Sequence, residues 1–208
     1  MAQEGIPIII SAPSGAGKTT ICQALAQRLP DLNFSVSHTT RKPRENEKEG
    51  VDYHFVSRET FLEMTNRNKF LEWAKIHDNY YGTGLKNIED TLKKGNDLVL
   101  ELDIQGVESL RALKYEGVYV FILPPSLEEL EQRLTRRGTE SGDQIQRRLE
   151  VGKNEIAQSH LYDYAVTNVN VDESVDTILA IIRAEKNRIR RYQPDCPEIR
   201  KILESGPA

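Results

Sequence analysis

The sequence predicts an α/β protein in which a parallel sheet is covered by helices on both faces. Short apolar runs at residues 6–10, 98–102 and 118–123 alternate with segments whose apolar residues recur every three or four positions. The first run passes into a glycine-rich turn and then a helical segment, which is how a βα unit begins. The chain of 208 residues suits one such domain with a sizeable core.

The first third of the chain opens with this βα unit. Ile21, Leu25 and Leu29 share one helical face, and Pro30 ends the helix. Residues 37–50 are rich in charge, Pro and Gly, so we expect them to lie outside the core. A short strand is expected at residues 52–56, followed by a small packed lobe.

Caps and breakers mark the elements of the remaining chain. Gly95 ends a helix that carries Leu85, Ile88 and Leu92. Ser126 with Glu129 forms a capping box at the start of another helix. The other expected elements are strands at 98–102, 118–123 and 164–167, and helices at 144–158 and from about 172. Arginines 188, 190 and 191 close the last helix and are expected to be solvated.

Composition limits the classes of partner. No run approaches the ~18 apolar residues of a membrane span, and the first residues lack the pattern of a signal peptide. Cys22 and Cys196 show neither metal spacing nor a disulfide framework, so reduced thiols in the cytoplasm are expected. A net charge of −4 argues against a nucleic-acid partner, whereas clustered arginines favour small anionic ligands. The oligomeric state stays open, a homo-oligomer included.

Residues 12–19 form a phosphate-binding loop between a strand and a helix. Glycines allow a tight turn that points successive N–H groups at phosphate oxygens, and the helix start adds its positive dipole end. Lys18 is expected to reach the β- and γ-phosphates, and the Thr19 hydroxyl to hold Mg²⁺. The residues assigned to this nucleotide triphosphate site are Ala12, Pro13, Ser14, Gly15, Ala16, Gly17, Lys18, Thr19 and Thr20.

Ala12 stands where this motif has its first glycine. A Cβ penalises a positive φ, so we expect that position to have an ordinary backbone conformation.

A second phosphate site is expected in the polar segment that follows. Residues 37–44 place hydroxyl groups beside Arg41 and Arg44. Guanidinium groups match phosphate oxygens bidentately, so a second phosphate suits this segment.

Several motifs together resemble the guanylate kinase family, over essentially the full length of the chain. The family's Ser-x-Thr-Thr-Arg-x-Pro-Arg signature is present from Ser37 to Arg44. Its Phe-x-Glu-Trp-Ala motif spans residues 70–74, and its Tyr-Tyr-Gly-Ser/Thr motif spans residues 80–83. Residues 133–138 resemble the family's lid.

The resemblance implies a GMP site with a phosphate end and a base end. The phosphate would be held by Arg41, Arg44, Tyr53 and Tyr81. The guanine would be contacted by Ser37, Glu72, Thr83 and Asp103, with Glu101 close by. Guanine donates from a ring N–H and an amino group and accepts at a carbonyl, so carboxylates and hydroxyls suit it. Adenine would leave a carboxylate facing an acceptor. Asp103 could serve either guanine or the metal.

The resemblance also implies transfer of the ATP γ-phosphoryl group to GMP, giving ADP and GDP, with Mg²⁺ as cofactor. Such transfer depends on positioning and charge stabilisation more than on covalent chemistry. The residues assigned to catalysis are Lys18, Arg44, Arg137 and Arg148, while Arg133 and Asn168 would contact ATP. Val169 follows Asn168 where the family often has Asp, which weakens the adenine assignment.

The expected fold is therefore that of a P-loop nucleoside monophosphate kinase built as one domain, residues 1–208. Its core would comprise residues 1–36, 96–126 and 159–208, its GMP-binding lobe 37–95 and its lid 127–158. The alternative is a non-catalytic guanylate-kinase-like binding module, which typically has a degraded phosphate loop. A kinase of another nucleoside monophosphate is a third hypothesis, against which Glu72 and Asp103 argue.

Overall fold

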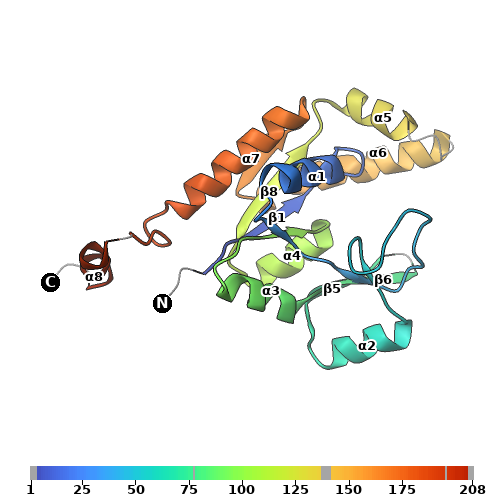
Figure 1. Cartoon of the computed structure of the whole chain (residues 1–208). Coiled ribbons are helices and arrows are strands. Elements are labelled where there is room, and N and C mark those ends of the chain that lie inside the picture. Colours follow the sequence, from blue (N-terminus) through green and yellow to red (C-terminus); the bar gives the residue numbers. More distant parts are fainter. Residues whose placement is uncertain (1–3, 77, 137–141, 195, 206–208) are drawn as a thin grey trace.

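A five-stranded parallel sheet runs through the centre of the molecule (Figure 1). The computed structural model describes residues 4–76, 78–136, 142–194 and 196–205. All pairings in this sheet are parallel. In spatial order its strands are β2 (Asn33–Phe34), β7 (Leu98–Glu101), β1 (Pro7–Ser11), β8 (Val118–Leu123) and β9 (Tyr164–Thr167). The predicted apolar strands are thus confirmed, and the two-residue strand β2 adds an edge.

The side chains of β1 alternate between two hydrophobic layers, as successive residues of a strand must. Ile8 and Ile10 belong to the layer that includes α1 (Lys18–Arg28) and α7 (Val171–Lys186). Ile9 points into the opposite layer, against α3 (Leu85–Lys93) and α4 (Ile104–Ala112). The sheet is therefore covered on both faces, as expected for parallel strands. Of these helices, only α4 was not predicted.

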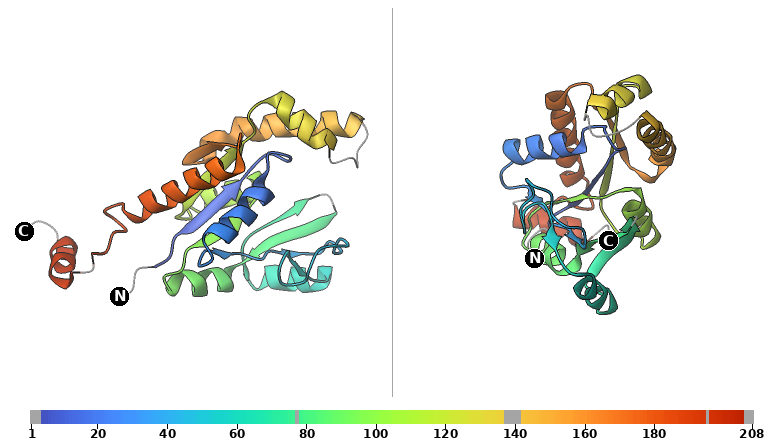
Figure 2. Two further views of the ribbon diagram at one scale, coloured as in Figure 1. Left: turned by 45° about the horizontal axis from the view of Figure 1, so that its top comes forward. Right: turned by 90° about the vertical axis from the view of Figure 1, so that its right-hand side faces the viewer.

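A second, smaller sheet lies beside the first and has α2 (Arg58–Asn66) next to it (Figures 1 and 2). Its order is β4 (His54–Phe55), β3 (His38–Thr39), β6 (Asn79–Gly84) and β5 (Phe70–Ile76), with β5 and β6 antiparallel. The expectation that residues 37–50 avoid the core is wrong at Thr39. This side chain is fully buried, and its hydroxyl accepts a hydrogen bond from the Arg41 backbone N–H at 3.1 Å.

Two helices extend from the carboxyl end of the main sheet, α5 (Leu127–Arg136) and α6 (Gly142–Ala157). They share a small apolar cluster of Leu130, Leu134 and Leu149. The predicted cap of α5 is present, since the Ser126 hydroxyl accepts from the Glu129 N–H at 3.0 Å. After α6 comes a short 3₁₀ helix, η1 (Gln158–Leu161).

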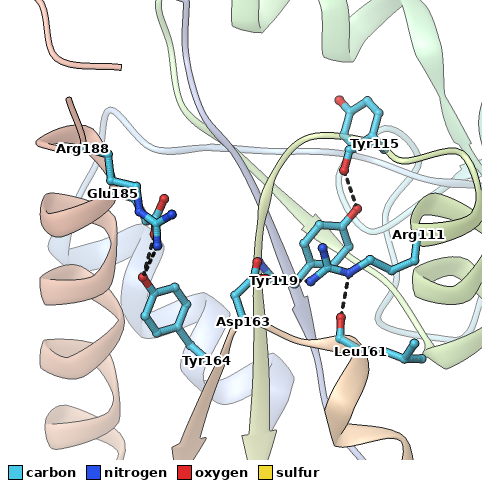
Figure 3. A network of polar contacts seen from close by, with 8 residues as sticks. All are labelled: Arg111, Tyr115, Tyr119, Leu161, Asp163, Tyr164, Glu185 and Arg188. Carbon is cyan, nitrogen blue, oxygen red and sulfur yellow. Dashed lines mark hydrogen bonds and ion pairs between the residues drawn. The ribbon is translucent and has the colours of Figure 1, made fainter. Parts of the chain in front are cut away.

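Polar networks close the opposite end of the sheet (Figure 3). The Glu185 carboxylate is buried at the end of α7 and binds Tyr164, Arg188 and Arg191. Arg191 is thus paired and only 16% exposed, which corrects the expectation for it, whereas Arg188 is paired but remains exposed to solvent.

The last helix, α8 (Pro197–Ser205), stands apart from the rest of the molecule (Figures 1 and 2). Within the described residues, no helix is long and apolar enough to cross a membrane.

Candidate active site

The phosphate-binding loop joins β1 to α1 at the carboxyl end of the sheet. Gly15 and Gly17 have φ values of 94° and 100°, in the left-handed region that favours glycine. Ala12 does not have a positive φ, which confirms the prediction for this position. The glycines are also required by space: a Cβ on Gly17 would lie 2.3 Å from Asn168 Nδ2. The loop is therefore shaped for bound phosphate before any ligand arrives.

Two side chains from distant parts of the chain brace this loop at Ala16. Asn168 Nδ2 donates to the Ala16 carbonyl at 2.8 Å, and Arg133 Nη1 donates to the same oxygen at 3.3 Å. Arg133 Nη2 also donates to the Asn168 carbonyl at 3.1 Å. Asn168 is only 4 % exposed. Both residues predicted to contact ATP therefore lie at the loop, and they hold its backbone as well.

Lys18 lies between the phosphate loop and the end of β7. Its Nζ donates to the Leu102 carbonyl at 3.3 Å. Thr19 and Thr20 follow in the first turn of α1 and are exposed, so their hydroxyls face solvent in the free protein. A cationic Nζ beside an exposed hydroxyl suits the phosphates and metal ion of a nucleotide triphosphate.

A cavity of about 170 Å³ opens between the loop and the smaller sheet. Lys18 is among the residues that line it, and so are Tyr53 and Tyr81, which form an edge-to-face pair with ring centroids 6.1 Å apart. It is lined by Lys18, Ser37, Tyr53, Glu72, Ala74, Ile76, Tyr81, Gly82, Glu101, Leu102 and Asp103. The structure thus brings together six of the residues predicted for the GMP site: Ser37, Tyr53, Glu72, Tyr81, Glu101 and Asp103.

Thr83 joins this group through hydrogen bonds. It is buried, and its hydroxyl donates to Glu72 Oε1 at 2.5 Å. The Ser37 and Thr83 hydroxyl oxygens are 3.3 Å apart. Asp103 caps α4 by accepting from the Gly106 N–H at 2.9 Å, which fixes the orientation of its carboxyl group. Two carboxylates and two hydroxyls therefore lie close together at this side of the cavity.

Burial changes the acidity of Glu72. Desolvation raises the pKa of its carboxyl group to about 6, the Asp103 charge adds to this rise, and the hydrogen bond from Thr83 opposes it. A carboxylate held in this way gains from any ligand that brings N–H donors to it.

The predicted phosphate arginines lie on the loop next to the cavity. The Arg41 guanidinium carbon lies 5.5 Å from the Tyr53 ring centroid, over the face of the ring. Its two terminal nitrogens each donate to the Glu47 carboxylate at 2.9 Å. The Arg44 side chain is exposed, while its backbone N–H donates to Glu47 Oε2 at 2.8 Å. Of the two arginines, Arg41 is thus fixed beside the cavity.

The two lid arginines predicted for catalysis are Arg137 and Arg148. Arg148 is half-buried on α6, next to Leu149 of the small apolar cluster. Arg137 lies outside the described residues.

Two acidic residues near the site escaped the sequence analysis. Glu47 could have been noticed because it follows Arg44 by three residues in a basic segment. Glu155 lies two helical turns after Arg148, on the same face of α6. Burial raises the pKa of Glu155, and the Ser14 backbone N–H and the Lys18 charge lower it, so its carboxyl group lies close to the phosphate loop.

The fold and the site together define a P-loop nucleotide kinase. A phosphate loop faces a second, polar cavity across the carboxyl ends of parallel strands, where such sheets bind ligands. A model of the guanylate kinase family matches residues 4–185. The chain belongs to the guanylate kinase family.

Guanylate kinases from other organisms are similar to this protein over nearly the whole chain. The guanylate kinase of Caldanaerobacter subterraneus subsp. tengcongensis is 48% identical over 189 residues, which cover 91% of this chain and 92% of that protein. The guanylate kinase of Geobacter metallireducens is 44% identical, with coverages of 92% and 94%. The crystal structure of guanylate kinase from Anaplasma phagocytophilum superimposes with a TM-score of 0.77 at 35% identity, covering 98% of this chain and 96% of that one.

Proposed function

We propose that the phosphate loop and the neighbouring cavity are the two substrate sites of this enzyme. As a guanylate kinase, the chain is a phosphotransferase that moves the γ-phosphoryl group of ATP to GMP, giving ADP and GDP. The observation that carries the site assignment is the cavity itself. It places Lys18 of the phosphate loop and the carboxyl groups of Glu72 and Asp103 around one space.

In this proposal the base end of the cavity selects guanine. Glu72 and Asp103 accept from the ring N–H and the amino group of guanine, and hydroxyl groups of Ser37 and Thr83 complete the set. A buried carboxylate facing the acceptor nitrogen of adenine would be left unpaired. Sites that depend on polar pairing can reject a wrong partner by ~10⁴-fold or more.

The phosphate of GMP is proposed to lie toward Arg41, Arg44, Tyr53 and Tyr81. The loop N–H groups and Lys18 hold the β- and γ-phosphates of ATP on the other side. The two substrates then meet near Lys18, and the protein contributes orientation and positive charge. Arg137 and Arg148 are proposed to add charge from the lid, with Arg133 and Asn168 bracing the ATP side.

Mg²⁺ is the cofactor that suits these side chains. Thr19 offers an exposed hydroxyl beside Lys18, and Glu101 and Asp103 provide carboxylates near the cavity. Oxygen ligands of this kind are the ones that Mg²⁺ prefers, usually with several waters retained. When bound with ATP, the ion would neutralise phosphate charge.

The division of the chain belongs to the same proposal. The main sheet would be the core, residues 37–95 the GMP-binding lobe, and residues 127–158 the lid. The separation of the two sheets and the distinct apolar cluster of α5 and α6 support it. We further propose that the enzyme acts in the cytoplasm and that its partners are small nucleotides rather than nucleic acid or membranes. This proposal is compatible with a homo-oligomer. The phosphate loop keeps Gly17, Lys18 and Thr19, which disfavours the binding-module alternative.

Calorimetry on an Arg44→Ala variant tests the assignment of the two sites. We expect GMP affinity to fall by tenfold or more, roughly the effect of one charge-assisted contact, while affinity for Mg·ATP changes little. Lys42→Ala is the matched control, because Lys42 is an exposed cation on the same loop. Equal loss of affinity for both nucleotides would contradict the division into a GMP site and an ATP site.

A further inference from the structure

Glu47 joins the two arginines that are assigned to the GMP phosphate. One carboxylate oxygen accepts from Arg41 Nη2 at 2.9 Å. The other accepts from Arg41 Nη1 at 2.9 Å and from the Arg44 backbone N–H at 2.8 Å. A single side chain thus fixes the guanidinium group of one arginine and the backbone of the other.

The pair is sheltered from water more than a surface ion pair is. The side chains of Arg41 and Glu47 are 18% and 17% exposed. The Tyr53 and Phe55 rings lie under the Arg41 guanidinium, at 5.5 and 5.9 Å from its carbon. The hydrogen bonds from Arg41 lower the pKa of the Glu47 carboxyl group, so it is ionised at neutral pH.

Glu47 and the Lys42 carbonyl occupy three of the N–H donors of Arg41, and the Tyr81 side chain hydrogen-bonds to the guanidinium as well. A guanidinium group has five N–H donors. Nη1 uses both of its N–H groups, on the Lys42 carbonyl at 2.8 Å and on Glu47, and Nη2 uses one on Glu47. The Nε–H and the second Nη2–H form the parallel pair that matches a phosphate.

We propose that Glu47 is a positioning residue for the acceptor phosphate. It holds Arg41 with its remaining N–H donors toward Tyr81 and the GMP phosphate, and it fixes the loop that carries Arg44. The proposal rests on the assignment of these arginines to the GMP site. The opposite role would be a gate, in which Glu47 occupies Arg41 and must be displaced by GMP.

The two roles predict opposite changes in KM for GMP. Removing a positioning carboxylate frees a long side chain, and its ordering then weakens phosphate binding. Removing a gating carboxylate strengthens phosphate binding, and so does the loss of its negative charge alone. We expect Glu47→Ala to raise KM for GMP by about tenfold or more, the usual effect of one charge-assisted contact. KM for ATP and inhibition by guanosine should change less than twofold, because guanosine lacks the phosphate.

Two further variants complete the experiment. Glu47→Gln should give an intermediate KM, because its amide oxygen accepts from one partner while its N–H₂ group faces donors. Glu45→Ala is the matched control on the same loop, since Glu45 is exposed. Thermal unfolding of each variant separates a folding defect from a binding defect, and Glu47→Gln serves if Glu47→Ala fails to fold.

The Arg41→Ala variant separates failure of the positioning role from failure of the proposed phosphate site. If KM for GMP rises in Arg41→Ala but not in Glu47→Ala or Glu47→Gln, the positioning role is overturned and the phosphate site stands. A lower KM in Glu47→Ala would show a gate. If Arg41→Ala leaves KM for GMP unchanged, the phosphate site itself is wrong, and the role of Glu47 with it.

Discussion

Glu72 is the half-buried residue that we propose to control the choice of substrate. Its carboxyl group accepts from Thr83 at 2.5 Å and lies beside Asp103, so two acidic groups share a poorly solvated cavity. This arrangement is costly in the free protein unless a partner with N–H donors arrives. Guanine presents a ring N–H next to its amino group, whereas adenine has an acceptor nitrogen in place of the ring N–H, so we propose that Glu72 selects the base as well as binding it.

The acidity of Glu72 predicts a pH dependence of GMP binding. Its pKa is raised to about 6, and guanine needs the ionised form. GMP binding should therefore be full above about pH 7 and weaken as pH falls through 6. The affinity at pH 5 is expected to be about tenfold lower. Calorimetry between pH 5 and 8 measures this.

Glu72→Gln separates this effect from the titration of the ligand, since a phosphate group also has a pKa near 6. The variant should keep the pH dependence that comes from the GMP phosphate and lose the part that comes from the Glu72 carboxyl group. It should also accept AMP more readily, because an amide can donate as well as accept. An identical pH profile in both proteins would remove Glu72 from base recognition.

Single residues also show where sequence reasoning stops. The cavity residues were predictable because they belong to motifs of fixed spacing, such as residues 70–74 and 80–83. The bracing of Ala16 by Asn168 joins positions 152 residues apart, so no local pattern reveals it. Glu47 lies three residues beyond the motif that ends at Arg44, yet its pairing with Arg41 depends on the folded loop.

At the scale of elements, the turn from β1 into α1 depends on the backbone of Gly17. Its φ of 100° disfavours any side chain, and a Cβ at this position would lie 2.3 Å from Asn168 Nδ2. We expect Gly17→Ala to weaken Mg·ATP binding at least tenfold and to lower stability by roughly 1–3 kcal/mol, the range for strained backbone.

Gly142→Ala is the matched control for this variant, because a Cβ there meets nothing within 4 Å. Nucleotide titration and thermal unfolding of both variants make the comparison. Unaltered ATP affinity in Gly17→Ala would show that the brace at Asn168 is not needed.

The end of α7 is joined to β9 through a buried carboxylate (Figure 3). Glu185 is 2% exposed and accepts from the Tyr164 hydroxyl at 2.6 Å, with Arg188 at 2.8 Å and Arg191 also bound. Glu185→Ala should lower the free energy of unfolding by about 1.5–3 kcal/mol, because it removes the charged acceptor that Tyr164 and the two arginines share.

Asp176→Ala on the same helix provides the comparison, since its ion pair with Arg28 is largely exposed. That change should cost less than about 1 kcal/mol. Chemical denaturation gives both values, and equal losses would contradict a special role for the buried carboxylate.

Elements differed in how well the sequence revealed them. Strands β8 and β9 match their predicted bounds, because three to six apolar residues in a row leave little ambiguity. Strands β2 and β3 have two residues each, which is too short for any periodicity. Helix α4 was missed although Asp103 caps it and Val107 and Leu110 are buried on one face. Asp103 was assigned to chemistry, and its capping role was overlooked.

At the scale of the whole molecule, the parallel sheet places the proposed substrate sites at the edge where its strands end. The phosphate loop follows β1, Asp103 follows β7 and Asn168 follows β9, so three segments far apart in the chain meet there. The smaller sheet then faces this edge with Glu72, Tyr81 and Thr83. Alternation of strands and helices was enough to predict this arrangement, whereas the pairing order within the smaller sheet was not accessible.

The most direct test of the account is ADP formation from Mg·ATP with GMP, AMP, UMP and CMP offered separately. We expect turnover with GMP and at least ~10⁴-fold less with AMP, because Glu72 and Asp103 would face an acceptor. Efficient turnover with another monophosphate would contradict the guanine site while keeping the kinase fold. The absence of turnover with any acceptor, in folded protein that binds ATP, would contradict the assignment as an enzyme.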